Sequence, residues 1–472
     1  MKRLKYSHRS RLVKGRTLIM VPSETIVAIS TPAGNGAIGI IRLSGPEALL
    51  FLGKLWKGHV PVSEFRPSQV YVGPLHSLEN QSLLDQVVTF YRQAPHSYTG
   101  EDVVEVQGHG GRQLLELLLK NFLVAGARMA EPGEFTKRAF LNGRMDLAQA
   151  EAVADLIHAT SEKAAQLANR QREGRLSEYV RGLRDKLKVM RAQMEAMIDF
   201  PEDEDVQGLH HEEVSERVES LSLQINHLLK TYEEGRILRE GARIAIIGKP
   251  NVGKSSLFNA LLQSDRAIVH ATPGTTRDLI EEVLNLRGLS VRFIDTAGIR
   301  KGEGGIEQEG IRRSQERLKQ ADLVLAVFDI SRPLDAEDEM VRESIGEISV
   351  LSVFNKKDLA PAFQPPNPHL SLSAKSGSGV EELKNEIYSH FINLDKNTGQ
   401  SDLILSNLRH HTALQNGWDT LQRLKKACEE KRPLELLVSD LTVAMNFLSE
   451  VTGEVTNDEI LGEIFAKFCI GK

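Results

Sequence analysis

The sequence predicts a multidomain protein of mixed α/β and α+β class, in which a parallel α/β domain is inserted into a helical domain. Three observations predict this class. β-Branched runs separated by turn residues extend to Gly111, apolar residues then recur at helical spacing up to Gly241, and buried strands alternate with helices from Arg243. A length of 472 residues suggests about two to four domains, each large enough to bury its own core.

Composition and charge exclude several classes of protein. Hydrophobic residues make up 41% of the chain, charged residues 26% and aromatic residues 5%, as expected of a globular protein rich in helix. The net charge of −5 provides no overall positive field for nucleic acid. The only two cysteines, Cys428 and Cys469, cannot form a disulfide framework or a structural zinc site, which favours a reducing, cytoplasmic compartment. No apolar run reaches the roughly 18 residues that span a bilayer, so we expect no membrane association.

The N-terminal region is expected to form an α+β domain over residues 23–140. Residues 1–22 are basic and contain no acidic residue; we expect a frayed extension without a role, with a transit peptide or a start at Met20 as alternatives. The helical pattern "RQLLELLLKNFL" follows the last of five strand-like runs. These runs are "TIVAIST", "GAIGIIRLSG", "SQVYVGPL", "LDQVVTFYR" and "DVVEVQGHG".

Long helices are predicted on both sides of the α/β insertion. Between Pro132 and Pro201 the chain has no proline, and apolar residues keep helical spacing over 146–171 and 179–200. A further helical pattern covers 215–238, and helical spacing returns near the C-terminus. We therefore expect one helical domain built from two stretches of sequence. The predicted boundaries are 141–240 for its first part, 241–396 for the inserted domain and 397–472 for its second part.

The inserted domain opens with a phosphate-binding motif. "GKPNVGKS", from Gly248 to Ser255, fits G-x-x-x-x-G-K-S, follows a predicted strand and begins a predicted helix. Glycines let backbone N–H groups surround phosphates at the helix N-terminus. Lys254 would reach the outer phosphates, and the Ser255 hydroxyl could bind Mg²⁺. The motif therefore predicts a P-loop.

Four further motifs in order predict GTP rather than ATP. "TTRD" offers Thr276 as a second hydroxyl for Mg²⁺, and "DTAG" begins with Asp295 at the end of a core strand. "NKKD" ends in Asp358, whose carboxylate can accept two hydrogen bonds from N–H groups that guanine has and adenine lacks. "SAK" follows the last strand. The residues expected to contact GTP are Asn251, Val252, Gly253, Lys254, Ser255, Ser256, Thr275, Thr276, Asp295, Thr296, Ala297, Gly298, Asn355, Lys356, Asp358, Ser373, Ala374 and Lys375.

The expected reaction is hydrolysis of the γ-phosphate by positioning and charge neutralisation. Ras-like GTPases orient the attacking water with a glutamine just after "DTAG", but this chain has Ile299 there. A carboxylate from Glu303, Glu307 or Glu309 could take that role, or these residues could be solvated loop charges. No arginine finger is evident, and Asn251 could instead hold a monovalent cation near the phosphates or simply form a turn.

Six stretches of the sequence together are typical of one family: "GAIGIIRLSG", "SYTGEDVVEVQGHGG", "EPGEFTKRAFLNGRMDLAQAEAVADLI", "GKPNVGKSSLFNAL", "GTTRD" and "FCIGK". From Glu24 to Lys472 the chain resembles the MnmE (TrmE) family of tRNA modification GTPases. The resemblance implies an N-terminal folate-binding domain that forms a homodimer, a helical domain in two parts and an inserted Ras-like G domain.

The resemblance also assigns the catalytic details of the G domain. Potassium is expected to drive dimerisation of the G domains, with Asn251 as its side-chain ligand, helped by Thr275 and by the backbone carbonyls of His270 and Thr272. Among the three glutamates, it selects Glu307 as the residue that positions the attacking water.

The resemblance implies a second chemistry on tRNA. With the flavoprotein MnmG, in a heterotetramer in which FAD belongs to the partner, the family adds an aminomethyl or carboxymethylaminomethyl group at C5 of the wobble uridine. The carbon is thought to come from 5-formyl- or methylene-tetrahydrofolate. The expected folate contacts are Arg42, Glu105, Arg144 and Lys472, although each could instead form a structural ion pair. Many relatives have lysine where this chain has Arg144, so the geometry there could differ.

The C-terminal stretch "FAKFCIGK" raises the question of what Cys469 does. The pattern C-x-x-X suggests prenylation, but Lys472 and Gly471 do not fit that signal and no polybasic run precedes the cysteine. From the residues alone, a buried inert cysteine is the default. The resemblance instead places Cys469 beside the one-carbon chemistry and predicts that the last four residues are ordered. The alternative function is an RNA-binding or ribosome-assembly GTPase without modification chemistry, although neither flank contains the GXXG loop of a KH domain.

Overall fold

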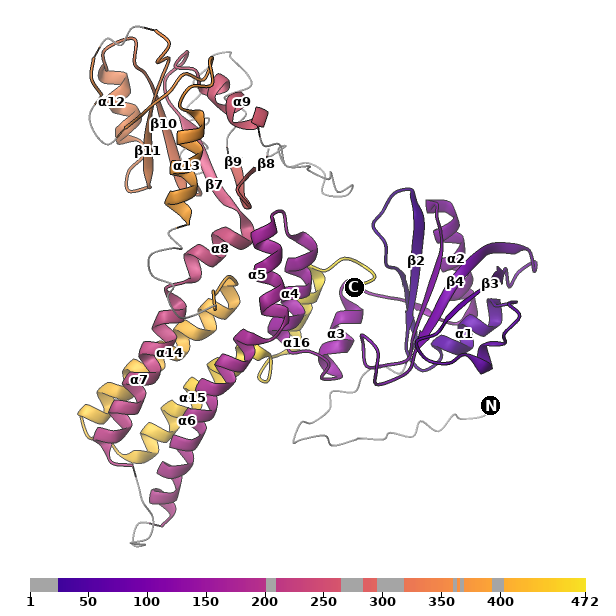
Figure 1. Cartoon of the computed structure of the whole chain (residues 1–472). Coiled ribbons are helices and arrows are strands. Elements are labelled where there is room, and N and C mark those ends of the chain that lie inside the picture. Colours follow the sequence, from indigo (N-terminus) through magenta and orange to yellow (C-terminus); the bar gives the residue numbers. More distant parts are fainter. Residues whose placement is uncertain are drawn as a thin grey trace. The chain divides into compact units, whose positions relative to one another are not determined.

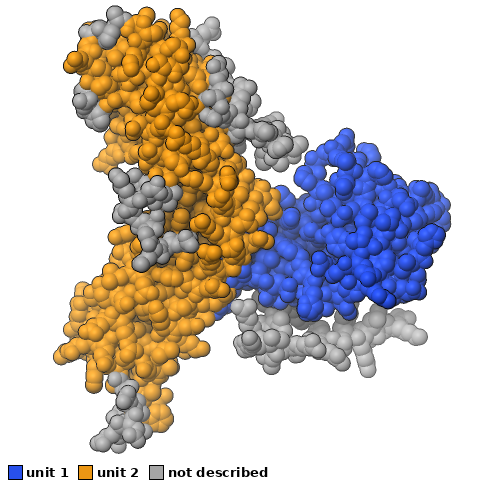
Figure 2. Space-filling model, viewed as in Figure 1, with its two compact units in different colours: residues 1–154, 452–472 blue, residues 155–451 orange. Residues whose placement is uncertain are grey.

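The chain folds into two compact units. The computed structural model describes residues 24–200, 209–264, 283–294, 318–359, 363–365, 369–392 and 403–472 (Figure 1). Unit 1 contains the residues up to 154 together with 452–472, and unit 2 contains residues 155–451 (Figure 2). The predicted extension over residues 1–22 lies outside the described residues, and the predicted domain boundaries remain predictions.

Unit 1 is built on a six-stranded sheet whose two faces have different characters. Ile41, Leu43, Val104 and Val106 alternate along their strands into a core shared with helices α1 (Ala48–Leu55) and α2 (Arg112–Ala125). Because side chains alternate, Arg42 and Glu105, which are partners in register, lie on the other face. The strand order is β3 (Val70–His76), β4 (Leu83–Arg92), β5 (Val103–Gly110), β2 (Gly36–Ser44), β1 (Ile26–Ile29) and β6 (Arg128–Met129), with a short 3₁₀ turn η1 (Val62–Glu64) outside the sheet.

The C-terminal segment packs onto helices of unit 1. Helix α16 (Asp458–Ala466) and Phe468 share a buried cluster with α3 (Glu134–Leu141) and with the start of α4 (Leu147–His158). At Gly133, just before α3, a Cβ atom would lie 2.7 Å from the carbonyl oxygen of Phe465. Only glycine permits this approach at its φ of 67°, so the end of the chain is held tightly against the N-terminal domain.

Unit 2 contains a helical bundle formed from both sides of the insertion. Helices α6 (Arg175–Asp199) and α7 (His211–Leu229) share one apolar core with α14 (Leu408–Glu429) and α15 (Leu434–Thr452). Sequence from before and after the α/β insertion therefore contributes to a single core. Among the described residues, no helix combines the length and the apolar character that crossing a membrane requires.

Two of the predicted long helices are interrupted, which periodicity did not reveal. Helix α4 ends at His158, and α5 (Glu162–Arg172) starts afresh because the Ser161 hydroxyl accepts a hydrogen bond from Ala164 N at 3.1 Å. Helix α7 ends at Leu229, and the Thr231 hydroxyl then accepts from Leu405 N at 3.0 Å, before α8 (Tyr232–Glu240) begins. Local capping and a contact from a distant segment therefore override the helical spacing.

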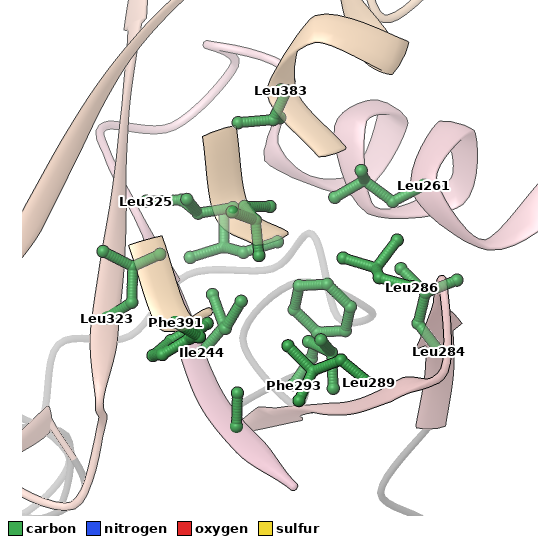
Figure 3. Close-up of a cluster of buried hydrophobic side chains, with 14 of the residues drawn as sticks. Ile244, Leu261, Leu284, Leu286, Leu289, Phe293, Leu323, Leu325, Leu383 and Phe391 are labelled. Atoms are coloured by element: carbon green, nitrogen blue, oxygen red, sulfur yellow. The ribbon is translucent and has the colours of Figure 1, made fainter. Parts of the chain in front are cut away.

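The inserted domain is an α/β sheet covered on both faces. Leu261 of α9 (Lys254–Ser264) and Leu383 of α13 (Val380–Phe391) face the strands on one side (Figure 3). A separate apolar cluster lies on the opposite face, next to α12 (Ala336–Glu343). The strand order is β12 (Leu370–Ser371), β11 (Val350–Asn355), β10 (Leu323–Asp329), β7 (Ala242–Ile247), β9 (Leu289–Ile294) and β8 (Val283–Leu286).

The sheet is parallel except at one edge. Strand β8, which no predicted run covered, runs antiparallel to β9 and forms this edge. A two-residue turn at Arg287 and Gly288, both with positive φ, joins the two strands. The other pairings of the sheet are parallel, which confirms the predicted fold class.

The core of the α/β sheet continues into helices of the bundle. Leu167 of α5 and Ile237 and Leu238 of α8 are buried in the same cluster as the strands β7 and β9. An ion pair between Arg236 and Asp322, 2.7 Å apart, reinforces this junction at the start of β10. The α/β domain is therefore anchored on α5 and α8 by apolar packing.

We expect Leu167→Ala to destabilise unit 2 by about 2–5 kcal/mol, because the lost methyl groups leave a cavity at this junction. The matched control is Leu223→Ala on α7, where the side chain is 60% exposed and the expected change is within about 0.5 kcal/mol. Urea unfolding monitored by circular dichroism measures both. Equal midpoints for the two variants would contradict the role assigned to Leu167.

Candidate functional site

The P-loop lies flat against the neighbouring strands because two of its positions are glycine. A Cβ at Gly248 would be 2.3 Å from the carbonyl oxygen of Val327, and a Cβ at Gly253 would be 2.2 Å from Asn355 Nδ2. Both glycines also have positive φ, of 149° and 96°. The loop therefore joins β7 to α9 as the motif predicts, with Asn251 exposed at its tip at a φ of 65°.

Lys254 is held inside the loop by the loop's own backbone. Its Nζ donates hydrogen bonds to the carbonyl oxygens of Gly248 and Lys249, both at 2.7 Å. Burial lowers the pKa of Lys254 below the usual lysine value. Ser255 and Ser256 follow in the exposed first turn of α9, whose N-terminus favours negative charge. The loop, Lys254 and the helix N-terminus together form a site for phosphate groups.

Asn355 connects the loops at the other end of the site. Its buried side chain donates from Nδ2 to the carbonyl oxygen of Val252 at 2.9 Å and accepts at Oδ1 from Ala374 N at 2.9 Å. Asp358 accepts a 2.6 Å hydrogen bond from the Ser373 hydroxyl, and this bond lowers the pKa of Asp358. The structure thus brings the predicted "NKKD" and "SAK" residues together, with the Asp358 carboxylate exposed and Lys375 also exposed.

Asp329, which holds Lys356 of the same motif, was not predicted from the sequence. Lys356 Nζ lies 2.6 Å from Asp329 Oδ2, and the Ser331 hydroxyl donates to the other oxygen at 2.6 Å. Burial raises the pKa of Asp329, but these hydrogen bonds outweigh it and the pKa is lowered. The signal available in the sequence was a carboxylate at the end of the strand "LVLAVFD", next to the P-loop strand.

Several predicted residues lie outside the described residues. They are His270, Thr272, Thr275, Thr276, Asp295, Thr296, Ala297, Gly298 and Glu307, together with the alternatives Glu303 and Glu309. Their roles remain predictions. Within the described ranges, no three His, Cys, Asp or Glu side chains gather as a metal site. Because Mg²⁺ at nucleotide sites takes few protein ligands and several phosphate and water oxygens, the exposed Ser255 hydroxyl fits such an ion.

The second site, in unit 1, joins the C-terminus to the sheet face that carries Arg42. Arg42 Nε donates to Glu105 Oε1 at 2.8 Å, and one Nη donates to the carbonyl oxygen of Gly471 at 3.3 Å. Ser30 Oγ donates to the same carbonyl at 3.2 Å. Burial, with a smaller contribution from Arg42, lowers the pKa of Lys472. The structure therefore brings three of the four predicted folate residues together.

Two aromatic rings lie beside Arg42, and the fourth predicted residue packs on the loop that carries one of them. The Arg42 guanidinium carbon lies 5.8 Å from the centre of the Tyr98 ring and 5.7 Å from that of Phe135. The Arg144 side chain packs on Gly100, where a Cβ would be 3.3 Å from Arg144 Cγ. Gly100 and Tyr98 belong to the same loop, so Arg144 lies on the segment that also borders Arg42.

Cys469 is exposed, and its carbonyl oxygen accepts from Lys472 N at 3.3 Å. The default expectation of a buried cysteine was therefore wrong for this residue, because the tail forms a turn on the surface of the site. The buried cysteine is instead Cys428, and burial raises the pKa of its thiol to about 11.

A buried arginine supports this site and was also missed. Arg138, 1% exposed, pairs with Glu134 at 2.9 Å and with Glu101 at 3.0 Å. Glu101 in turn accepts from the Ser44 hydroxyl at 2.7 Å, which fixes the loop that carries Tyr98. In the sequence, Glu134 and Arg138 resemble an ordinary i,i+4 pair on a helix surface, so only the fold reveals their burial.

The fold and these two sites together define the class of protein. The chain combines a P-loop G domain with a helical domain and an N-terminal domain that binds the chain's own C-terminus. The family profile described as "GTP-binding protein TrmE N-terminus" matches residues 25–144, and that described as "MnmE helical domain" matches residues 147–469.

Curated relatives extend over nearly the whole chain. The tRNA modification GTPase MnmE of Aquifex aeolicus is 45% identical over 95% of this chain and 100% of its own length. The protein of the same name from Geobacter metallireducens is 43% identical over 96% of this chain and 100% of its own length. The chain therefore belongs to the MnmE family of tRNA modification GTPases, which confirms the resemblance. A solved structure, the G domain of the T. maritima FeoB iron transporter, is 29% identical over 32% of this chain and 98% of its own, but the TM-score of 0.24 is too low to establish a shared fold.

We expect Ser373→Ala to weaken binding of a fluorescent GDP analogue about 3- to 10-fold at pH 7, because Asp358 loses a hydrogen bond to its charged form. That bond lowers the Asp358 pKa, so without it the carboxylate becomes protonated at a higher pH. The loss should therefore grow as the pH falls below about 5, where an aspartate that lacks this bond begins to take up a proton. Ser378→Ala, in the exposed part of the same loop, is the control. A deficit that does not change with pH would contradict the link to Asp358.

Proposed function

We propose that this protein hydrolyses GTP in the cytoplasm and uses this reaction in tRNA modification. The partner is the flavoprotein MnmG, and the product carries an aminomethyl or carboxymethylaminomethyl group at C5 of the wobble uridine. The observation that carries the proposal is the docking of Gly471 and Lys472 at Arg42 and Glu105 in a chain that also holds a P-loop site. The curated relatives are named tRNA modification GTPases, which supports the same function.

In the G domain, the chain's own groups bind and orient GTP. Asp358 accepts from the guanine N–H groups, and backbone N–H groups of the P-loop hold the phosphates with Lys254. Mg²⁺, held by Ser255 and Thr276, would neutralise charge on the outer phosphates. Glu307 positions the attacking water. These arrangements place positive charge and hydrogen-bond donors where negative charge develops.

A potassium ion held by this chain would supply the positive charge that an arginine finger provides in other GTPases. Asn251 offers its side-chain oxygen, supported by Thr275 and by the carbonyls of His270 and Thr272. The exposure of Asn251 at the tip of the P-loop supports this role, since its amide can reach a ligand there. Binding of the ion would join two G domains, in a protein that we propose to be a homodimer through its N-terminal domains.

The Arg42 site takes a 5-formyl- or methylene-tetrahydrofolate. Among the described residues, Arg42 uses Nε and one Nη for protein contacts, which leaves its second Nη for a ligand carboxylate. Glu105 can accept from pterin N–H groups, while Arg144 and Lys472 attract the glutamate tail. Cys469, exposed next to Lys472, lies beside the one-carbon unit. FAD belongs to the partner, and the two proteins form a heterotetramer.

We expect Arg42→Ala and Cys469→Ser to abolish the wobble-uridine modification in cells while the purified proteins still hydrolyse GTP, because the changes lie outside the G domain. Nucleoside mass spectrometry of bulk tRNA from strains that carry each variant measures this. The control is Arg112→Ala, where the exposed guanidinium pairs with Glu116 on its own helix. Normal modification in both variants would instead favour a GTPase that binds RNA without taking part in its chemistry.

We expect GTP turnover to be several-fold faster in KCl than in NaCl for the wild type, because the smaller sodium ion does not satisfy the same ligands. Asn251→Ala should lose this difference and keep GDP affinity, since the backbone of the loop binds the phosphates. Steady-state phosphate release in the two salts provides the comparison. Equal wild-type rates in both salts would exclude the potassium proposal.

A further inference from the structure

Lys249, the second residue of the P-loop, has a buried side chain that the proposed mechanism does not use. It is 5% exposed, and its ammonium group pairs with Asp338, at 2.7 Å from Oδ2, and with Asp335. The Asp338 side chain is 4% exposed. A lysine is rarely buried to this extent unless it is paired, and both of its partners come from one segment at the start of α12.

The two carboxylates also form the N-terminal cap of α12. The Asp335 side chain accepts from the backbone N–H groups of Glu337 and Asp338, and the Asp338 carboxylate accepts from Asp335 N at 3.1 Å. This reciprocal arrangement is a capping box, which fixes both carboxylates relative to the helix. The ammonium of Lys249 is therefore bound to a rigid helix end and not to mobile surface groups.

The pair fixes one half of the phosphate-binding loop. The carbonyl oxygen of Lys249 receives a hydrogen bond from Lys254 Nζ, so the residue is part of the loop's inner surface. The other half of the loop is held at Val252 by the Asn355 amide. The P-loop thus has two side-chain anchors, one from α12 and one from β11, on either side of the exposed Asn251.

Stability alone does not explain this pair. An apolar side chain of similar size can replace a buried ion pair with little loss of stability, whereas an ion pair holds its members in a defined geometry. We infer that Lys249 is a positioning residue for the nucleotide: its pairing with Asp338 and Asp335 fixes the first half of the P-loop in the geometry that binds phosphates. The inference rests on the proposed GTPase function.

The test is nucleotide binding and turnover by Asp338→Asn, which keeps the volume of the side chain and an acceptor for the helix cap. The dissociation constant of a fluorescent GDP analogue and the KM for GTP should both rise about tenfold, with kcat within about twofold, because binding that is uniform through the reaction changes KM alone. Lys249→Met should behave alike, and Lys249→Arg should recover binding to within about threefold of wild type.

The control is Glu337→Gln, one residue away on the same helix, with the same change of charge on an exposed side chain. It should bind GDP as the wild type does. The double variant Lys249→Met/Asp338→Asn should bind GDP no more weakly than the single variant that has the lower affinity, because both changes break the same interaction. Additive losses, or an Asp338→Asn variant with wild-type affinity, would overturn the inference.

GDP binding by the wild type and thermal melting of each variant separate a failure of the inference from a failure of the proposed function or of folding. A wild-type protein that binds no GDP would refute the proposed GTPase function itself, which is distinct from a wild type that binds while Asp338→Asn binds equally well. Thermal melting of the nucleotide-free proteins shows whether each variant folds. If Asp338→Asn does not fold, the Asp335→Asn variant is tested in its place. Asp335 is exposed, and an asparagine at this position can still cap the helix. A threefold or greater loss of affinity there supports the inference, and an unchanged affinity overturns it.

Discussion

The buried amide of Asn355 is the constraint on which the nucleotide site depends. Its nitrogen donates to the P-loop at Val252 and its oxygen accepts from Ala374, so one side chain joins three loops that are distant in sequence. Aspartate at this position would place an oxygen against the Val252 carbonyl, and an apolar residue would leave both backbone groups without partners. A residue that the sequence predicts to contact GTP is therefore also the support of the phosphate site.

The same principle holds in the N-terminal domain, where the end of the chain completes a site begun near its start. Gly471 contributes no side chain, yet its carbonyl accepts from both Ser30 and Arg42. A Cβ at this position would be 2.4 Å from the carbonyl oxygen of Ile29, so the tail can reach Arg42 only with glycine there. Docking of α16 against α3 brings the tail to this place, and the pairing of Arg138 with Glu101 holds the loop that carries Tyr98.

The sequence predicted the elements whose signals are local. Apolar runs located the strands of both sheets except β6 and β8, which no predicted run covered. The P-loop, "NKKD" and "SAK" motifs lie together as their strand contexts implied. The breaks before α5 and α8 were not predicted, because a capping serine and a hydrogen bond from Leu405 act against an uninterrupted helical spacing. Asp329, Lys249 and Arg138 were missed for another reason. Each pairs with a residue from a different segment, and a charged side chain in the sequence gives no sign of its burial.

The burial of Leu167, Ile237 and Leu238 within the sheet's own core has a consequence for how the protein can be divided. The inserted G domain is continuous in sequence, but its hydrophobic core is not contained within that stretch. A fragment cut at the ends of the insertion would expose the apolar surface of β7 and β9 to water and would tend to aggregate. A fragment that keeps this core covered must therefore include α8 and a covering for the surface that α5 occupies. The inserted stretch of sequence and the set of residues that closes its core are not the same.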